Sequence, residues 1–300
     1  LFDCFNGFAS KNKPFQSILE ACTVFVIPIL NPDGAEAYTR FNANGVDLNR
    51  DAQHLSQPES QLLRQVYTDF KPHYCFNLHG QRTIYNVGTT NVSATLSFLS
   101  PSQDADCTLT ANRIDAMAII SEINSLLQTE IPNGIARYDD GFNLNCVGDT
   151  FQNFGVPTLL YEAGHYPNDY NREDVRRLLY LAIIKGLDVI SKGVNTTNYK
   201  RYFSIPENSK CFYDIIVRNA KINKSNSVLD IGIQYEETLV DNTIVFVPKI
   251  EAISKLNDFY GHREIDAKHT IIKIVGNEIL NIGAKIDCLL INNERIVLKR

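Results

Sequence analysis

The sequence lacks the features that mark membrane-spanning and nucleic-acid-binding proteins. No stretch approaches the ~20 consecutive apolar residues that a membrane-spanning helix requires, so no span is predicted. Basic residues are not in excess, because 29 lysines and arginines stand against 34 aspartates and glutamates. A net charge of −5 gives no general attraction to nucleic acid or to acidic membranes. We therefore expect neither as a partner, and the 44% hydrophobic composition is that of an ordinary globular protein.

Closely spaced cysteine pairs are also absent. The seven cysteines are odd in number and form no CxxC motif. Cys22 and Cys75 lie in apolar, strand-like runs, which favours buried free thiols over a disulfide framework. Free thiols favour a reducing compartment such as the cytoplasm. An upstream signal peptide stays an open alternative, because the chain starts at Leu1 rather than Met and its opening run, LFDCFNGFA, is typical of an amphipathic helix entered partway.

The first two thirds of the sequence alternate between strand and helix patterns. Continuous apolar runs rich in branched residues predict buried strands, and apolar residues at helical spacing predict helices. The predicted strands cover residues 23–30, 74–78 and 156–161, and the predicted helices cover 58–70, 112–127 and 172–192. Such alternation favours an α/β fold, with a parallel or mixed sheet flanked by helices.

The last third has a different pattern. A polar, turn-rich linker follows Gly193, and beyond it short alternating runs are separated by turn residues without a long helix. The strands predicted there cover 212–217, 228–234, 243–247, 270–274, 286–291 and 295–298. We therefore predict two domains: an α/β domain over residues 1–195, and a small C-terminal all-β domain, a sandwich or barrel, over 206–300.

Three polar residues stand where the predicted strands of the first domain end. Asn31 follows the first strand, His79 the second and Glu162 the third. In sheets of this kind the carboxyl ends of the strands converge on the ligand crevice. A carboxylate directly behind an apolar strand is also costly unless it is paired, solvated or functional. The three positions therefore indicate a functional site.

Residues 31–51, NPDGAEAYTRFNANGVDLNRD, combine turn formers with fixed charges. Arg40 and Arg50 stand in this loop, and they could be solvated or paired with neighbouring aspartates. Beside Asn49 at a strand end, they could instead form a fork for a carboxylate, because guanidinium groups bind carboxylates through two hydrogen bonds. The residues alone leave both interpretations open.

The order of these motifs resembles the zinc carboxypeptidases, the M14 metallocarboxypeptidases. NPDG, then Arg40 and GVDLNRD, are followed by His79 in FNLHG and Glu162 in PTLLYEAGH, which is the order that the family uses. The resemblance covers about residues 1–195. It implies a carboxypeptidase-like fold, a mixed and mostly parallel sheet flanked by helices. It also implies a Zn2+ cofactor and peptide substrates with a free C-terminal carboxylate.

The resemblance further implies a role for each motif residue. Asn49 and Arg50 would hold the terminal carboxylate of the substrate, and Arg40 would stabilise the oxyanion of the tetrahedral intermediate. His79 would be a zinc ligand, and Glu162 would be the general base that activates the zinc-bound water. The implied function is that of a metallopeptidase that hydrolyses the C-terminal peptide bond of peptides.

The sequence departs from the family pattern in two places. The family's other two zinc ligands, a His and a Glu in an HxxE motif before NPDG, do not occur in residues 1–30, and we expect them in a segment upstream of Leu1. The family's tyrosine, on a mobile loop that closes over the substrate, is matched by Tyr138 with imperfect spacing to Glu162. Residues 145–150 are predicted to line the pocket for the terminal side chain without indicating its preference.

Other functions stay open. The protein could be a peptidoglycan-peptide hydrolase or an amide deacylase on the same fold. Such an enzyme would have other residues in place of the carboxylate-binding set Arg40, Asn49 and Arg50. A catalytically inactive protein that binds C-terminal tails would keep the arginines and lack HxxE. The sequence gives no indication of oligomeric state.

Overall fold

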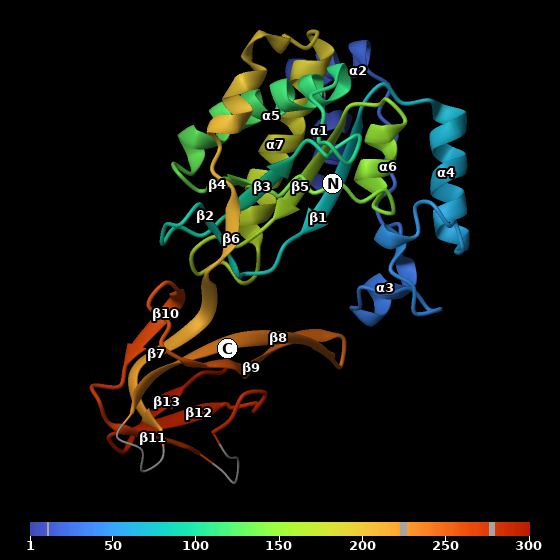
Figure 1. Cartoon of the computed structure of the whole chain (residues 1–300). Helices are drawn as coiled ribbons and strands as arrows, with labels where there is room; N and C mark the ends of the chain where they lie inside the picture. Colours follow the sequence, from blue (N-terminus) through green and yellow to red (C-terminus); the bar gives the residue numbers. More distant parts are fainter. Residues whose placement is uncertain (11, 223–226, 276–279) are drawn as a thin grey trace. The chain divides into compact units, whose positions relative to one another are not determined.

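The chain forms two compact units (Figure 1). This computed structural model describes residues 1–10, 12–222, 227–275 and 280–300. Unit 1 comprises Leu1–Arg82 and Val92–Ser209, and unit 2 comprises Thr83–Asn91 and Lys210–Arg300. The short segment that follows the strand carrying His79 therefore belongs to the C-terminal unit, although it lies early in the sequence.

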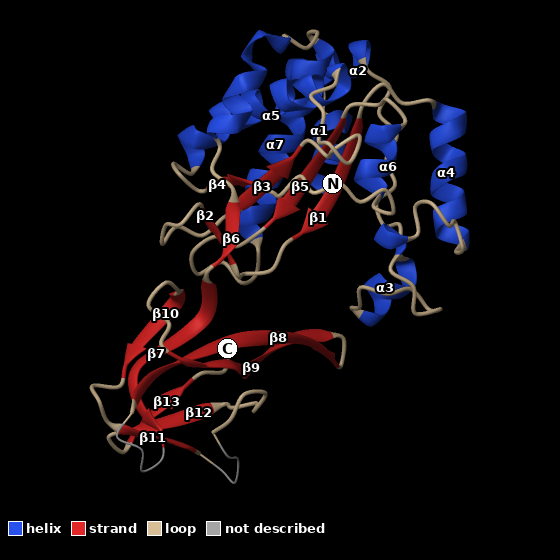
Figure 2. Ribbon diagram, in the orientation of Figure 1, coloured by secondary structure: helices blue, strands red, loops and turns tan. Residues whose placement is uncertain are grey.

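Unit 1 is built on a four-stranded sheet covered by helices (Figure 2). The neighbouring strands β1 and β5 are parallel, β5 and β3 are antiparallel, and β3 and β4 are parallel. The predicted fold class, a mixed and mostly parallel sheet flanked by helices, is confirmed. In spatial order the strands are β1 (Cys75–Gly80), β5 (Thr158–Ala163), β3 (Leu96–Leu99) and β4 (Ile135–Arg137).

The helices of unit 1 begin and end at residues that favour those positions. α4 (Pro58–Phe70) has proline in its first turn and ends at Lys71, which is left-handed and precedes Pro72. No helix in the described ranges is long and apolar enough to cross a bilayer. The other helices are α1 (Phe2–Ala9), α2 (Lys13–Ala21), α3 (Pro32–Ala37), η1 (Leu48–Arg50), α5 (Ala111–Glu130), α6 (Val147–Asn153), α7 (Glu173–Ser191) and η2 (Thr196–Ser204).

The core of unit 1 lies between the sheet and the pair α5 and α7. Ile119 and Ile123 of α5 and Leu178 of α7 are fully buried, and they belong to one apolar cluster with Leu159 and Tyr161 of β5. Side chains alternate along a strand. Because Tyr161 points into this core, the next residue, Glu162, points to the opposite face.

The strand predicted over residues 23–30 is wrong. The segment is extended, but within the described ranges it belongs to no sheet, and Phe25 and Ile29 are 54% and 60% exposed. Apolar, branched composition favours extended backbone, whereas a strand also needs a neighbour to accept its hydrogen bonds. No such neighbour lies beside this segment in the described parts of the chain.

Unit 2 is all-β, as predicted. Two of its hairpins have two-residue turns, Asp241-Asn242 and Asn292-Asn293, and all four residues have positive φ as a type I′ turn requires. Each predicted run forms a strand, and β2, β6 and β10 are strands that were not predicted. The elements are β2 (Tyr85–Val87), β7 (Phe212–Ile222), β8 (Val228–Val240), β9 (Thr243–Ser254), β10 (Tyr260–Asp266), β11 (Ile271–Ile274), β12 (Cys288–Ile291) and β13 (Glu294–Val297), while β6 (Asn208–Lys210) spans the boundary with unit 1.

Candidate active site

The site begins with a pair of residues at the carboxyl ends of two neighbouring strands. His79 of β1 and Glu162 of β5 are register partners in the parallel ladder. Register partners on adjacent strands point to the same face of a sheet, with the strands about 4.8 Å apart. An imidazole and a carboxylate therefore lie side by side on the face opposite the α5–α7 core.

The amino end of α6 lies against this same face. A side chain at Gly148 would come within 3.4 Å of the amide nitrogen of Asn77, and Asn77 shares its face with His79, two residues further along β1. The backbone N–H of Val147 donates to Oδ1 of Asn49 at 3.0 Å. This bond joins the charged loop 31–51 to α6 and brings Asn49 to the site.

Two short helical turns shape the charged loop, and each is capped by a loop side chain. Oδ1 of Asn31 accepts the N–H of Gly34 at 2.9 Å at the start of α3. Asp47 caps η1 by accepting the N–H of Asn49 at 3.0 Å, and its other oxygen pairs with Nε of Arg40 at 2.7 Å. Asp47 therefore positions both Arg40 and Asn49.

Asp51 fixes the end of the loop. It is 3% exposed, and its carboxylate accepts the backbone N–H groups of Ser56 and Gln57, each at 3.0 Å. Burial alone would raise the pKa of Asp51, but these hydrogen bonds outweigh burial and hold that pKa below its ordinary value. An ionised Asp51 therefore anchors the backbone directly after Arg50.

The charges of this loop reach His79. Burial lowers the pKa of His79, the positive charges of Arg40 and Arg50 lower it further, and Asp47 opposes them. The imidazole is thus kept neutral, which is the form that binds metals. Its Nε2 atom is buried and has no hydrogen-bond partner within the described ranges.

Glu162 is half-buried, and no hydrogen bond or ion pair engages its carboxylate among the residues that the structure describes. Burial raises the pKa of Glu162 to about 7, while the charge of Arg40 acts in the opposite direction. A carboxyl group with this pKa exchanges protons near neutral pH, as a general base does. The positive charge of Arg40 lowers the pKa of both His79 and Glu162, so this charge acts on both members of the pair.

Comparison with known proteins indicates the same family as the sequence motifs. The zinc carboxypeptidase family model matches residues 4–173, more than half of the chain. The chain belongs to the zinc carboxypeptidase family. Members of this family are metallopeptidases.

Individual carboxypeptidases also match parts of the chain. Carboxypeptidase 2 of Trichophyton rubrum is 30% identical over 71 residues, which are 24% of this chain and 13% of that protein. Carboxypeptidase SOL1 of Arabidopsis thaliana is 34% identical over 86 residues, which cover 25% of this chain and 18% of that protein. A solved metallo-carboxypeptidase from Burkholderia cenocepacia is similar at 15% identity and a TM-score of 0.44, with 60% of this chain and 47% of that chain covered. The matched regions therefore span less than half the length of these relatives.

A zinc site needs three protein ligands, and the described residues supply one candidate. The orphaned, buried Nε2 of His79 fits a metal ligand. Within the described ranges, however, no group of three or more His, Cys, Asp or Glu residues could hold a metal ion. HxxE is likewise missing from residues 1–30.

Tyr138 follows the strand at the far edge of the sheet from His79. This strand is β4, at the opposite edge from β1, and the backbone N–H of Tyr138 donates to Phe98 O at 2.8 Å. β4 is antiparallel to β5, so its carboxyl end points away from the strand ends that carry His79 and Glu162. The hydrogen bonds and charges described above connect Arg40, Asn49, Arg50, His79 and Glu162, whereas the assignment of Tyr138 stays a prediction.

The predicted pocket segment 145–150 lies next to Asn49, because the N–H of Val147 in this segment donates to Oδ1 of Asn49. Asp149 in this segment is 8% exposed, and burial raises its pKa to about 6 despite a hydrogen bond from Asn143 N and the charge of Arg50. Sequence analysis did not identify Asp47 and Asp51 as the residues that hold the loop. For Asp47 the signal was present, because an aspartate directly before a helical turn is a common cap. Asp51 accepts N–H groups five and six residues further along, a spacing that no local motif predicts.

Proposed function

We propose that the protein is a metallocarboxypeptidase that hydrolyses the C-terminal peptide bond of peptides, with Glu162 as its general base. The observation that carries this proposal is the register pairing of His79 with Glu162. One residue offers a buried nitrogen without a partner in the described ranges, and its neighbour offers a carboxyl group with a pKa of about 7. A hydrolytic metal site needs both groups: a nitrogen that is free to bind the metal, and a neighbouring base that accepts a proton near neutral pH.

His79 and two ligands outside the described residues would hold zinc, which would supply Lewis acidity at the scissile carbonyl. Glu162 takes a proton from the attacking water and delivers it to the departing amine. A pKa near 7 suits both steps, because the group must accept the proton and release it within one turnover.

Arg40 is proposed as the residue that meets the negative charge on the attacked carbonyl oxygen. Its side chain is 60% exposed and is oriented by the 2.7 Å ion pair with Asp47. A cation that is fixed before the reaction stabilises developing charge without reorganisation. The influence of Arg40 on both His79 and Glu162 supports this location.

Asn49 and Arg50 are proposed to bind the terminal carboxylate of the substrate. Nη1 of Arg50 donates to its neighbour's carbonyl, Asn49 O, at 2.9 Å, and the Arg50 side chain remains exposed. Oδ1 of Asn49 is taken by Val147 N, which turns the amide NH2 into the group that is left for a ligand. A guanidinium and an amide donor together favour substrates with a free C-terminus.

A second candidate function is a binding protein for C-terminal tails without catalysis. The absence of a complete metal-binding cluster from the described residues favours it. Such a protein would use Asn49 and Arg50 in the same way, and it would need neither zinc nor Glu162.

The test is made on the full gene product, with zinc measured by elemental analysis and turnover measured on one peptide in two forms, with a free or an amidated C-terminus. We expect one zinc per chain and far faster cleavage of the free form than of the amidated form. A protein that binds the free form but holds no zinc and releases nothing would establish the binding function instead. Faster cleavage of the amidated form, or of an acyl-amide substrate, would point to a deacylase.

A further inference from the structure

A row of three polar residues crosses the sheet of unit 1. His79 of β1 pairs with Glu162 of β5, and Glu162 pairs in turn with Ser97 of β3. Side chains alternate along a strand. Tyr161 and Phe98, which neighbour this row on β5 and β3, belong to the apolar core, with ring centroids 5.3 Å apart. Glu162 and Ser97 therefore share the opposite face, and Glu162 stands between His79 and Ser97.

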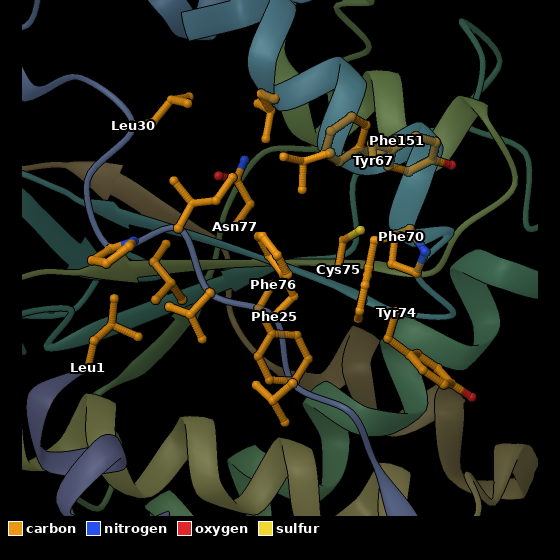
Figure 3. Close-up of a pocket in the computed structure, with 18 of the residues that line it drawn as sticks. Leu1, Phe25, Leu30, Tyr67, Phe70, Tyr74, Cys75, Phe76, Asn77 and Phe151 are labelled. Carbon is orange, nitrogen blue, oxygen red and sulfur yellow. The ribbon is translucent and has the colours of Figure 1, made fainter.

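The same alternation is visible along β1. In the pocket shown in Figure 3, the labelled Asn77 points to the side of Tyr67 and Phe151. Tyr74 points to the other side, where it packs against the core. His79 stands two residues after Asn77, so it lies on the same face as Asn77. The polar row therefore faces away from the core that α5 and α7 cover.

Ser97 lies directly opposite Glu162. The two strands are antiparallel here, and directly opposed residues in such a pair have Cβ atoms about 4.5–5.5 Å apart. Over this distance, rotation of the Glu162 side chain is enough to bring its carboxylate to the Ser97 hydroxyl. Ser97 is fully buried, so bulk water does not reach its hydroxyl.

A chain of side-chain amides fixes the direction of the Ser97 hydroxyl. Nε2 of Gln81 donates to Ala94 O at 2.8 Å, because a carbonyl oxygen can only accept. Oε1 of Gln81 is therefore an acceptor, and Nδ2 of Asn208 donates to it at 3.4 Å. The same Nδ2 atom donates to Oγ of Ser97 at 3.3 Å. An amide nitrogen only donates, so Oγ of Ser97 accepts and its own hydrogen is left to donate elsewhere.

Gly164 provides the space for this chain. A Cβ atom at position 164 would lie 2.1 Å from Ala94 O and 2.3 Å from Nε2 of Gln81. Because both distances are far below van der Waals contact, a side chain at this position would displace the Gln81 amide from Ala94. Gly164 stands two residues after Glu162. The segment that supplies the carboxylate therefore also makes room for the amide chain beside it.

The Ser97 hydroxyl and the Glu162 carboxylate complement each other. In the part of the chain that the structure describes, the Ser97 hydroxyl only accepts a hydrogen bond and the Glu162 carboxylate takes part in none. A buried donor is normally paired, and an ionised carboxylate is purely an acceptor. Glu162 is the carboxylate in direct register with Ser97.

We propose that Ser97 is a positioning residue, whose hydroxyl donates to one oxygen of the Glu162 carboxylate and leaves the other oxygen turned toward His79. The inference rests on the proposed function, because that function makes Glu162 the general base. Orientation of a base before the reaction is important, since a displacement of about 1 Å can cost a hundredfold in rate. Asn208 and Gln81 act one step further back, because they keep the Ser97 hydroxyl a donor.

Steady-state kinetics on the full gene product test whether Ser97 acts through Glu162. Ser97→Ala should lower kcat about tenfold, because the base loses a charge-assisted hydrogen bond, while KM stays within about twofold. In the Glu162→Gln background the same substitution should lower the residual kcat by less than about twofold, because its effect passes through the carboxylate. An equal loss in the two backgrounds, or an unchanged kcat in Ser97→Ala, would overturn the proposal.

Two variants at Asn208 test the direction of the amide chain. Asn208 is only partly buried, so its substitution disturbs the fold less than a change at Ser97. Asn208→Asp keeps the shape but only accepts, so it draws the Ser97 hydrogen away from Glu162 and should lower kcat about tenfold. Asn208→Ala removes the donor without offering an acceptor and should lower kcat by about threefold or less. A larger loss in Asn208→Ala than in Asn208→Asp would overturn the assigned direction.

Ser100→Ala is the matched control. Ser100 is also fully buried, and its hydroxyl donates to Arg113 O at 3.2 Å. Its kcat should stay within about twofold of the parent, because this hydroxyl already has its acceptor. A tenfold loss in Ser100→Ala would show that any lost hydroxyl slows the enzyme, and it would overturn the special role of Ser97.

A crystal structure of the full gene product measures the contact independently of activity. We expect Oγ of Ser97 within about 2.5–3.0 Å of a Glu162 carboxylate oxygen, and a separation above about 3.5 Å would overturn the proposal. This contact in a protein that holds no zinc and releases no product would overturn the proposed function and leave the hydroxyl–carboxylate pair in place. Zinc and turnover without the contact would overturn the inference about Ser97 alone.

Discussion

His79 and Glu162 are register partners, so their separation is set by the hydrogen-bonded ladder between β1 and β5. Groups held by strands keep their geometry better than groups held by loops. Arg40, Asn49 and Arg50, by contrast, stand on a loop that depends on its own caps. We therefore expect substitutions in the strand pair to change chemistry, and substitutions of Asn49 and Arg50 in the loop to change substrate binding.

Glu162→Gln should lower kcat by about 10²–10⁴-fold, because it removes the proton acceptor without changing the size of the side chain. Zinc content should be unchanged, since Glu162 is assigned as a base and not as a ligand. Steady-state kinetics and elemental analysis on the same preparation check both points. Glu130→Gln is the control, because Glu130 forms a surface ion pair with Arg177. Turnover retained in Glu162→Gln would remove Glu162 from the mechanism.

The stability of the metal-free protein should depend on pH through the same residue. The pKa of Glu162 is raised from 4.5 to about 7, so folding favours the protonated form. Its stabilising contribution is full below pH 4.5 and is lost as pH rises through 7. At pH 8.5 the parent should be less stable than Glu162→Gln by about 1–3 kcal/mol, with the difference vanishing at pH 4. Urea unfolding in the presence of a chelator measures both values, and a constant difference would contradict the assignment.

Arg40 should set the acid limb of the pH–rate profile. Its charge lowers the pKa of Glu162, so Arg40→Gln should move the acid limb of kcat/KM to higher pH. It should also lower kcat, because the developing oxyanion loses its counter-charge. Arg176→Gln is a matched control, since Arg176 is exposed and pairs with Asp3 and Glu173 at the surface. An unshifted limb in Arg40→Gln would place Arg40 away from Glu162.

Much of unit 1 could be predicted because its signals are local. Helix 58–70 has a proline at its start and Lys71-Pro72 at its end, and β1 and β5 are short apolar runs that end at His79 and Glu162. The segment 23–30 has the same composition as these strands, yet it is unpaired in the described structure, because pairing depends on a neighbour that composition does not reveal. β10 was not predicted because its sequence, YGHREID, is rich in charged residues, as is typical of an exposed strand, and so lacks an apolar run.

The positions of the site residues could be predicted where an apolar run in the sequence shows where a strand ends. His79, Glu162 and the charged loop follow strand signals directly, and the family motifs indicate their roles. Tyr138 could not be placed in this way. Its position depends on the direction of β4, which is set by pairing with β3 and is not visible in the residues themselves.

Asp51→Ala should destabilise the protein by about 1–3 kcal/mol, because the N–H group of buried Gln57 and that of Ser56 lose their acceptor. It should also raise KM, since Asp51 holds the backbone directly after Arg50. Asp51→Asn keeps an acceptor oxygen and should lose less on both measures. Thermal or urea unfolding and steady-state kinetics provide the values. A change in KM without a change in stability would mean that Asp51 contacts the substrate itself.

Arg50→Ala should discriminate between substrates by their C-terminus. A charge-assisted hydrogen bond contributes about 1.5–3 kcal/mol, so kcat/KM for a peptide with a free carboxylate should fall by about 10–150-fold. The amidated peptide carries no charge for the guanidinium to bind, and its slow turnover should change little. Arg50→Lys keeps the charge but loses the fork, and should recover part of the activity on the free peptide. Equal losses on the two peptides in Arg50→Ala would show that Arg50 supports the loop through its bond to Asn49 O and does not bind the substrate.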